Sequence, residues 1–493
     1  MIKRVYNWCA EHPSLMVALM AMVYYSLMSA KTYTWIFVSG DSGDWLASST
    51  WWMVPQPMGS PLYILLGRFL NVFPGDLVVK MTILLSCLPG AVTVGLVCNI
   101  ARTLTGRADL GVIAGGVLLG ATIYLTQTTI LEEYSIAIMF VVLGYWFYLR
   151  GQRKWTAVAL ALGTGVHIVV APIFALWLIV EYHEWRKWLV PLGLYAVLTA
   201  GSYSLILVLM AMESPPLLAG YLNFDSILQY FTGTAGAVIG TGSIFDFPQR
   251  LALATGMLVV SLGLCIIPIT YALGRPMART TTLMVTTVGF ALWFHLTSLD
   301  PVSWTFMCFG VPFMAVLGAL GMSKLRMKHV RAVAIGAVAL IVINCALMNA
   351  GQIAQERPEA GEYYEVIQGL PNGSAVMIYQ SRYSLGLFYA MAEGREDLAP
   401  IVAFTAETPE KFADYLGWME EEYGIKGNST LEMLGSAYGQ GRNTYVVGEA
   451  WFYDAIDRGM WPDLSTTFNL SRSGSNESWL HEVVGCTGLS SRR

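Results

Sequence analysis

Residues 155–180 read WTAVALALGTGVHIVVAPIFALWLIV, and this apolar stretch decides how the chain is threaded through a membrane. It lies between two basic clusters, at residues 150–154 and 186–187. One long helix would place these clusters on opposite sides of a membrane, whereas two short helices that turn near His167 would place them on the same side. Since short connections between spans carry Lys and Arg on the cytoplasmic side, we predict a helical hairpin.

Each helix of this hairpin is too short to cross about 30 Å of hydrocarbon. Short helices are tolerated at membrane depth where they pack against protein or line a water-filled cavity. The hairpin therefore predicts a cavity that opens to the outer side of the membrane.

The remainder of the first 350 residues repeats this alternation of apolar runs and basic connections. Hydrophobic residues make up 55% of the 493-residue chain and charged residues only 13%, against about a quarter in a soluble domain. Of the 19 Lys and Arg residues before Gly351, 15 fall in six short connections, near residues 3–4, 102–107, 150–154, 186–187, 275–279 and 324–331. The sequence is therefore typical of an α-helical polytopic membrane protein.

Placing all six connections in the cytoplasm predicts about eleven spans. They cover residues 14–36, 77–99, 109–128, 134–149, 155–166, 168–182, 188–211, 251–273, 281–297, 302–322 and 332–350. The N-terminus is then cytoplasmic, and the first apolar segment is a retained span rather than a cleaved signal. The C-terminal tail is extracytoplasmic, at the cell exterior or in the ER lumen.

The composition changes abruptly after Gly351. The last 143 residues hold 20 of the 33 carboxylates and contain no long apolar run. Strand-like stretches at residues 375–379, 401–404 and 444–447 alternate with helix-like ones, which favours a soluble α/β domain with a partly parallel sheet. We therefore expect a transmembrane domain over residues 1–350 and an extracytoplasmic α/β domain over residues 351–493.

Several classes of function are disfavoured. The seven cysteines include no Cys-x-x-Cys spacing, so neither a zinc site nor a disulfide framework is indicated. The net charge of −4 argues against a nucleic-acid partner. An ion-coupled transporter would hold carboxylates near the bilayer midplane, whereas here most carboxylates fall on the outer side. That placement favours an enzyme, with a polytopic lipid or solute transporter as the alternative and a surface scaffold third.

The first outer loop carries a pair of aspartates in the stretch 39–46, SGDSGDWL. Asp41 or Asp44 could act as a general base on an acceptor hydroxyl, or the two could cap the loop or a helix start. Such a pair is also a weak signal for a divalent cation. The prolines in WWMVPQPMGSPL, residues 51–62, interrupt any helix there, and a short interfacial helix that carries Arg68 follows.

Two further outer elements carry candidate residues. The turn at residues 127–134 reads QTTILEEY, and because adjacent helical residues point about 100° apart, at most one of its two glutamates is expected to face a cavity. The alternative is a solvated helix N-terminus. His167 could donate to a phosphate or orient a carboxylate, or it could be a packing residue. Arg250, at the end of the long outer loop, could pair with a phosphate or anchor the next helix.

Taken in order, four of these segments resemble one family. They are GDSGD at residues 40–44, VPQPMGSPL at 54–62, EEYSI at 132–136 and GTGVH at 163–167. This order is similar to that of the protein O-mannosyltransferase-related family of the GT-C glycosyltransferase superfamily, whose animal member O-mannosylates receptor ectodomains. The resemblance covers roughly residues 30–180.

The resemblance implies a GT-C fold, a polyprenyl- or dolichyl-phosphate sugar as donor, and an outward-facing active site. It implies that Asp41 is the base and that Glu132 is the family's glutamate. This sequence departs from the family pattern at Gln56, which replaces a loop histidine and cannot be cationic, so a phosphate contact there is weakened or moved. Lys80 corresponds to a basic residue at the start of the second span, within one position.

The combined prediction is a membrane glycosyltransferase that moves mannose or another hexose, with inversion, from the lipid carrier to an extracytoplasmic acceptor, a protein hydroxyl or a glycan. The catalytic candidates are Asp41, Asp44 and Glu132. The candidates for binding donor phosphate or substrate are His167, Gln56, Arg68, Lys80, Arg250 and Tyr134. No metal ligand set is predicted, and no cofactor is expected beyond the weakly indicated cation.

Overall fold

A computed structural model gives the fold. It describes residues 11–30, 45, 49, 60–73, 76–213, 247–274, 278–297, 305–355, 367–379, 395, 397–403, 416–417, 419–427, 430–447, 468–472 and 480–486. The chain divides into two compact units, which are described separately. The helical unit comprises residues 1–42, 56–207 and 224–357, and the second unit comprises residues 43–55, 208–223 and 358–493.

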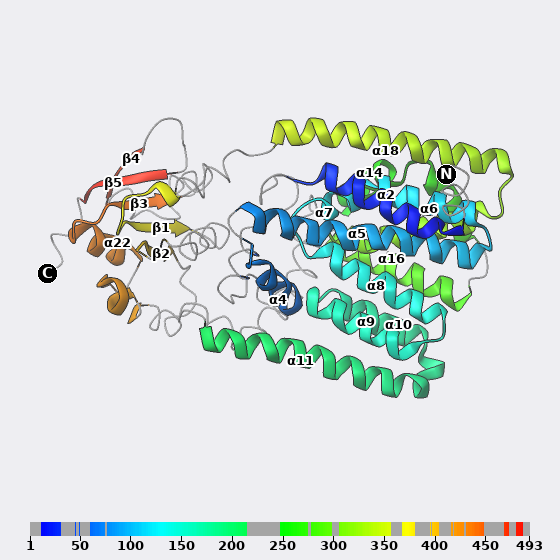
Figure 1. The fold of residues 1–493 in the computed structure, drawn as a ribbon, viewed down its shortest axis with the longest axis horizontal. Coiled ribbons are helices and arrows are strands. Elements are labelled where there is room, and N and C mark those ends of the chain that lie inside the picture. Colours follow the sequence, from blue (N-terminus) through cyan, green and yellow to red (C-terminus); the bar gives the residue numbers. More distant parts are fainter. Residues whose placement is uncertain are drawn as a thin grey trace. The chain divides into compact units, whose positions relative to one another are not determined.

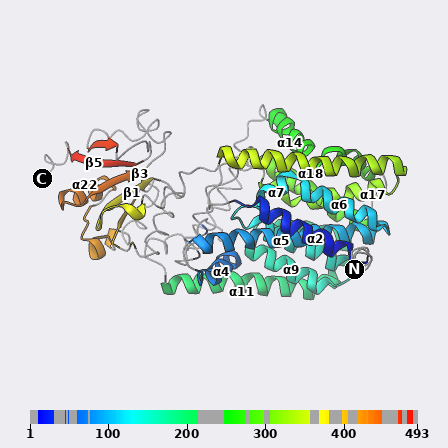
Figure 2. The ribbon, with the colours of Figure 1, turned by 45° about the horizontal axis from the view of Figure 1, so that its top comes forward.

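The helices run roughly along one direction (Figures 1 and 2). In the N-terminal half they are α2 (Pro13–Met28), α4 (Pro61–Leu70), α5 (Asp76–Thr105), α6 (Ala108–Gly120), α7 (Thr122–Thr128), α8 (Tyr134–Leu149), α9 (Arg153–Val166) and α10 (Val170–Val180). Then follow η1 (Tyr182–Trp188), α11 (Leu189–Glu213), α14 (Phe247–Leu262), η4 (Gly263–Cys265), α15 (Ile266–Leu273), α16 (Arg279–Thr297), η5 (Thr305–Phe309), α17 (Val311–Met322) and α18 (Met327–Gln355). Helix α5 lies at the centre, against α2, α6, α8 and α17.

These helices lie where the sequence predicted apolar spans. Among the described residues, four helices are long and apolar enough to cross a membrane, and the bent pair α6–α7 makes a fifth if it is one span. Others are short: α10 has 11 residues, which is about 16 Å of helix. The count of about eleven spans therefore stays a prediction, since it depends on where short helices sit in a bilayer.

Helices α6 and α7 form one predicted span that bends by 67°. At the bend, a Cβ on Gly120 would lie 3.2 Å from the backbone nitrogen of Ile341, so only glycine allows α18 this close. The bend frees backbone groups, and neighbouring helices bond them. The Asn344 amide donates to the Gly120 carbonyl, and the Ser261 hydroxyl accepts from the Ile123 N–H at 3.1 Å.

Helices α9 and α10 form the predicted hairpin. Pro172 lies in the first turn of α10, where a proline is tolerated, whereas a helix continuing from α9 would bring its ring against the carbonyl of Ile168. His167 instead has extended backbone, with φ −150°. The far ends meet: Arg153 at the start of α9 lies 3.6 Å from Glu181, directly after α10.

The end of the hairpin opposite His167 is held by a buried carboxylate. Glu181 accepts a 2.7 Å hydrogen bond from the Tyr148 hydroxyl at the end of α8, and Arg279 at the start of α16 lies 3.5 Å from it. Arg153 also pairs with Glu184. The two basic clusters that flank the hairpin thus lie at the same end of the bundle, as the sequence predicted.

The second unit contains a five-stranded mixed sheet in the order β2-β1-β3-β5-β4. Its strands are β1 (Ala375–Tyr379), β2 (Ala399–Ala403), β3 (Thr444–Val447), β4 (Phe468–Arg472) and β5 (Leu480–Cys486), and helix α22 (Thr430–Gly439) packs against β1, β2 and β3. Strand β1 is parallel to β2 and β3, and β5 is antiparallel to β3 and β4. The three predicted strands are present, while the division at residue 350 and an independent α/β domain stay predictions.

Candidate functional site

A buried acid and a buried histidine face each other where two turns of the helical unit meet. The Nε2 atom of His167, in the turn between α9 and α10, lies 3.6 Å from Oε1 of Glu133, in the turn before α8. Glu133 is 1% exposed and His167 8%. At this distance the direct contact is slightly longer than a hydrogen bond, so a small polar group or a water could also bridge the two atoms.

The protonation of His167 follows from its own turn. Its Nδ1 atom accepts a hydrogen bond from the backbone N–H of Val169 at 3.2 Å. An imidazolium would carry a proton on Nδ1 and could not accept this bond. The geometry therefore favours the neutral ring with its proton on Nε2, directed toward Glu133.

Aromatic rings surround the histidine. The ring of Tyr134, the first residue of α8, lies 4.8 Å from the His167 ring, centroid to centroid. Phe309 and Phe306 of η5 lie at 5.9 and 6.3 Å. The rings fix the imidazole and lower the local dielectric constant, which strengthens polar interactions at Glu133.

The turn that carries the glutamates is held from two other helices. Ser86 of α5 donates a 2.8 Å hydrogen bond to the Glu132 carbonyl. Tyr63 of α4, also buried, lies close enough to Glu132 and Glu133 to interact with both electrostatically. We call this set the Glu133–His167 cluster; it consists of Tyr63, Ser86, Glu132, Glu133, Tyr134, His167, Phe306 and Phe309.

Helix α4 packs closely against the end of α9 at Gly165, two residues before His167. A Cβ on Gly165 would lie 2.8 Å from Cδ1 of Leu62 in α4 and 3.0 Å from Oγ of Ser202 in α11. Glycine therefore lets α4 approach the end of α9. Because Leu62 is the last residue of the motif at residues 54–62, this contact brings the end of that motif to the turn that carries His167.

The structure brings together part of the predicted site. Glu132, Tyr134 and His167 all belong to the cluster, but the acid that contacts His167 is Glu133, whereas the family resemblance pointed to Glu132. Asp41, Asp44 and Gln56 lie outside the described residues.

The three basic candidates lie on separate helices. Arg68 is in the last turn of α4, and Lys80 is exposed near the start of α5. Arg250 on α14 donates a 3.2 Å hydrogen bond to the Leu296 carbonyl at the end of α16, which ties two helix ends together. Their roles toward a phosphate stay predictions.

Sequence reasoning did not single out four members of the cluster. Tyr63 and Ser86 lie in largely apolar helices, and nothing local separates them from packing residues. Phe306 and Phe309 are spaced i, i+3 directly before a span, a pattern that is equally typical of an interfacial belt. Only the tertiary contacts identify them. Within the described residues, no three His, Cys, Asp or Glu side chains are grouped as a metal site would require.

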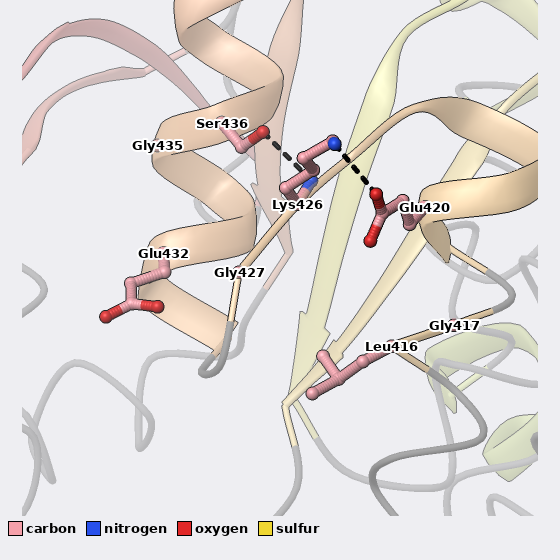
Figure 3. A pocket seen from close by; sticks show the side chains of 8 residues that line it. All are labelled: Leu416, Gly417, Glu420, Lys426, Gly427, Glu432, Gly435 and Ser436. Carbon is pink, nitrogen blue, oxygen red and sulfur yellow. Dashed lines mark hydrogen bonds and ion pairs between the residues drawn. The ribbon is translucent and has the colours of Figure 1, made fainter.

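The second unit has a surface pocket of ≈ 560 Å³ between the segment before Tyr423 and α22 (Figure 3). Lys426 points to Glu420 there, with a 2.7 Å ion pair, and its backbone N–H donates to Ser436. Glu432 points away from this pair (Figure 3). Since the Lys426–Glu420 pair is exposed and mutually satisfied, we place the chemistry at the buried Glu133–His167 cluster instead.

One protein family matches the part of the chain that holds Glu133 and His167. Residues 41–189, which include both turns, match the model of the protein O-mannosyl-transferase TMEM260 N-terminal domain. The comparison with curated proteins gives no match.

Several solved structures share the fold. ArnT from Cupriavidus metallidurans bound to undecaprenyl phosphate is 14% identical with a TM-score of 0.65, covering 95% of this chain and 97% of that one. The same ArnT in its apo state is 13% identical with a TM-score of 0.63, covering 96% of this chain and 98% of that one. The Archaeoglobus fulgidus oligosaccharyltransferase, in complex with Zn and sulfate, gives 13% identity and a TM-score of 0.51, covering 90% of this chain and 68% of that one.

All of these proteins are GT-C glycosyltransferases, and the likeness of the structures concerns the fold. Residues 41–189 therefore match the N-terminal domain of a protein O-mannosyltransferase family, and the chain shares its fold with GT-C glycosyltransferases.

Proposed function

We propose that the chain is a glycosyltransferase that moves a hexose, with mannose the first to test, from a polyprenyl- or dolichyl-phosphate carrier to a hydroxyl of an extracytoplasmic protein or glycan. The observation that carries this proposal is the buried pair of Glu133 and His167, 3.6 Å apart inside the family's domain. Burying an acid and a histidine in an apolar bundle is costly, and proteins keep such pairs preferentially at the sites where substrates bind.

The first-loop carboxylate supplies the base in this proposal. Asp41 takes the proton of the acceptor hydroxyl while that oxygen attacks the anomeric carbon. The bond from the anomeric carbon to the phosphate oxygen breaks, and the lipid phosphate leaves with the electron pair. Attack opposite the leaving group inverts the configuration at this carbon.

The Glu133–His167 cluster positions the substrate. The neutral His167 presents a single donor, Nε2–H, and Glu133 presents acceptors, so together they can hold a sugar hydroxyl in one orientation. Arg68, Lys80 and Arg250 are the cations proposed for the donor phosphate. The apolar helices give a polyprenyl chain a lipid-facing surface beside them, as the ligand of the ArnT structure suggests.

The proposal includes an orientation. The basic end of the hairpin, with Arg153 and the neighbouring cations, faces the cytoplasm. The Glu133–His167 cluster then faces the outer side, and so does the tail from residue 351, where it can meet the acceptor.

The test uses the full-length protein in lipid nanodiscs. Polyprenyl-phosphate mannose, glucose and galactose, each labelled in the sugar, are offered with a Ser/Thr-rich peptide, and released lipid phosphate and labelled peptide are measured. We expect turnover with one donor and its loss in Asp41→Asn. Glu11→Gln, an exposed glutamate before α2, serves as the matched control and keeps full turnover. A folded protein that turns over none of these donors, or an Asp41→Asn variant with unchanged turnover, would contradict the proposal.

A further inference from the structure

Gln127 is a polar side chain with nothing to bond to among the described residues. It lies in the last turn of α7 and is 0% exposed. Within that part of the chain, neither its Nε2 nor its Oε1 atom has a hydrogen-bond partner. A buried amide left without partners costs several kcal/mol, so such a group in a native protein calls for an explanation.

Gln127 lies on a helix that packs against two elements of the Glu133–His167 cluster. Helix α7 packs against η5 and α8, the two elements that carry Phe306, Phe309 and Tyr134. Cys308 of η5 interacts electrostatically with Tyr124, three residues before Gln127. It also interacts with Glu133, six residues after Gln127. In the sequence, Gln127 therefore lies between two residues, Tyr124 and Glu133, that both interact with Cys308.

A second buried group without a partner lies in the same stretch. The Ser135 hydroxyl, in the first turn of α8, is 0% exposed and has no hydrogen-bond partner in the described segments. These two groups lie on either side of the paired glutamates. Together they indicate that this part of the protein is built to receive a polar ligand.

The chemistry of the amide selects the ligand. A carboxamide both donates and accepts. A phosphate only accepts, so it would leave Oε1 without a donor, and the buried carboxylates of Glu132 and Glu133 would repel it. Sugar hydroxyls both donate and accept, and they can also donate to those carboxylates.

We propose that Gln127 binds a hydroxyl of the sugar being transferred and so helps to determine which sugar the protein accepts. This inference rests on the proposed function and assigns Gln127 as a specificity residue. The lipid phosphate then binds elsewhere, and Gln127 discriminates between sugars that differ in one hydroxyl.

The test pairs a protein variant with modified donors. Gln127→Met removes both polar atoms at similar volume, and the donors are polyprenyl-phosphate mannose and its 2-, 3-, 4- and 6-deoxy forms. We expect kcat/KM for the mannose donor to fall about tenfold in Gln127→Met, as the loss of a buried hydrogen bond predicts. For one deoxy donor the two proteins should be equal, because the partner hydroxyl is already absent. Gln152→Met, at an exposed glutamine, should change kcat/KM neither for the mannose donor nor for the deoxy donors.

Three other results would overturn the assignment. One is a loss of kcat/KM in Gln127→Met that is equal for all donors. Another is a Gln127→Met protein whose kcat/KM equals that of the wild type. The third is a lowered melting temperature of Gln127→Met, as a structural role such as holding a buried water would give. We expect that temperature unchanged or raised, because removing unbonded buried polar atoms is neutral or stabilising. If the wild-type protein turns over no donor and no donor raises its melting temperature, the proposed function fails as well, and this result is distinct from the others.

Discussion

His167 and Glu133 lie 3.6 Å apart, Nε2 to Oε1, although one belongs to the turn between α9 and α10 and the other to the turn before α8. The His167 ring is oriented from both sides, since Val169 N–H bonds its Nδ1 atom and Tyr134 packs on its face. The imidazole is therefore held both by its own turn and by the first residue of α8. This relationship separates the roles of the two adjacent glutamates.

Glu133 should matter more for turnover than Glu132. We expect Glu133→Gln to lower kcat by about 10- to 100-fold, because a substrate held by the pair with His167 loses its alignment, while Glu132→Gln lowers it less. His167→Asn, whose side-chain oxygen can still accept from Val169 N–H, should retain more activity than His167→Ala. The measurements are kcat and KM with melting temperature for each variant. Equal losses in Glu132→Gln and Glu133→Gln would show that the contact with His167 does not separate them.

The packing of α4 against Gly165 should be disturbed by the addition of one methyl group. In Gly165→Ala the new Cβ meets Leu62 and Ser202 at 2.8 and 3.0 Å, and we expect a loss of about 1–3 kcal/mol in the free energy of unfolding, with reduced turnover because α4 moves away from His167. Gly116→Ala in α6 is the matched control, since its new methyl group would have no atom within 4 Å. It should be neutral or stabilising by up to about 1 kcal/mol. Thermal unfolding in detergent measures both, and a Gly165→Ala protein as stable as Gly116→Ala would contradict the close packing.

Glu181 should contribute to stability and not to chemistry. Its side chain is 0% exposed beside Arg153 and Arg279, so Glu181→Ala leaves two cations without their buried partner, and we expect a loss of about 3 kcal/mol. Glu184, 26% exposed, is the control: Glu184→Ala should destabilise the protein much less, because ion pairs near the surface contribute little. Glu181→Ala protein that remains folded at low temperature should keep its kcat. A loss of kcat without a loss of stability would show that Glu181 contributes to turnover.

The sequence allowed the hairpin to be predicted but not the bend between α6 and α7. Charges on both sides of residues 155–180 required an even number of crossings, and that is a property of the sequence alone. The bend instead depends on Gly120 meeting Ile341 and on Asn344 bonding the freed carbonyl, more than 200 residues away. Likewise, what distinguishes Glu133 from Glu132 is that Glu133 faces His167. The sequence cannot show this, because it does not reveal where the distant turn between α9 and α10 will lie.

The second unit should lose stability at acid pH through Asp397. The Arg395 side chain donates hydrogen bonds to this carboxylate, and these, together with a bond from the Gly373 N–H, hold the pKa of Asp397 below its usual value. A carboxyl whose pKa is lowered in the folded state stabilises that state above its unfolded pKa, about 3.9. This stability is lost as the pH falls through the lowered folded pKa.

Hydrogen exchange of the full-length protein measures this effect at residues 367–379, where Arg395 also bonds the carbonyls of Ile367 and Leu370. We expect protection in the wild-type protein to weaken progressively as the pH falls from about 5 toward 2. In Asp397→Asn the protection should be lower at pH 7 and should lack this part of the pH dependence. Wild-type and Asp397→Asn proteins with the same pH profile would show that the Arg395–Asp397 pair does not contribute to the stability of this segment.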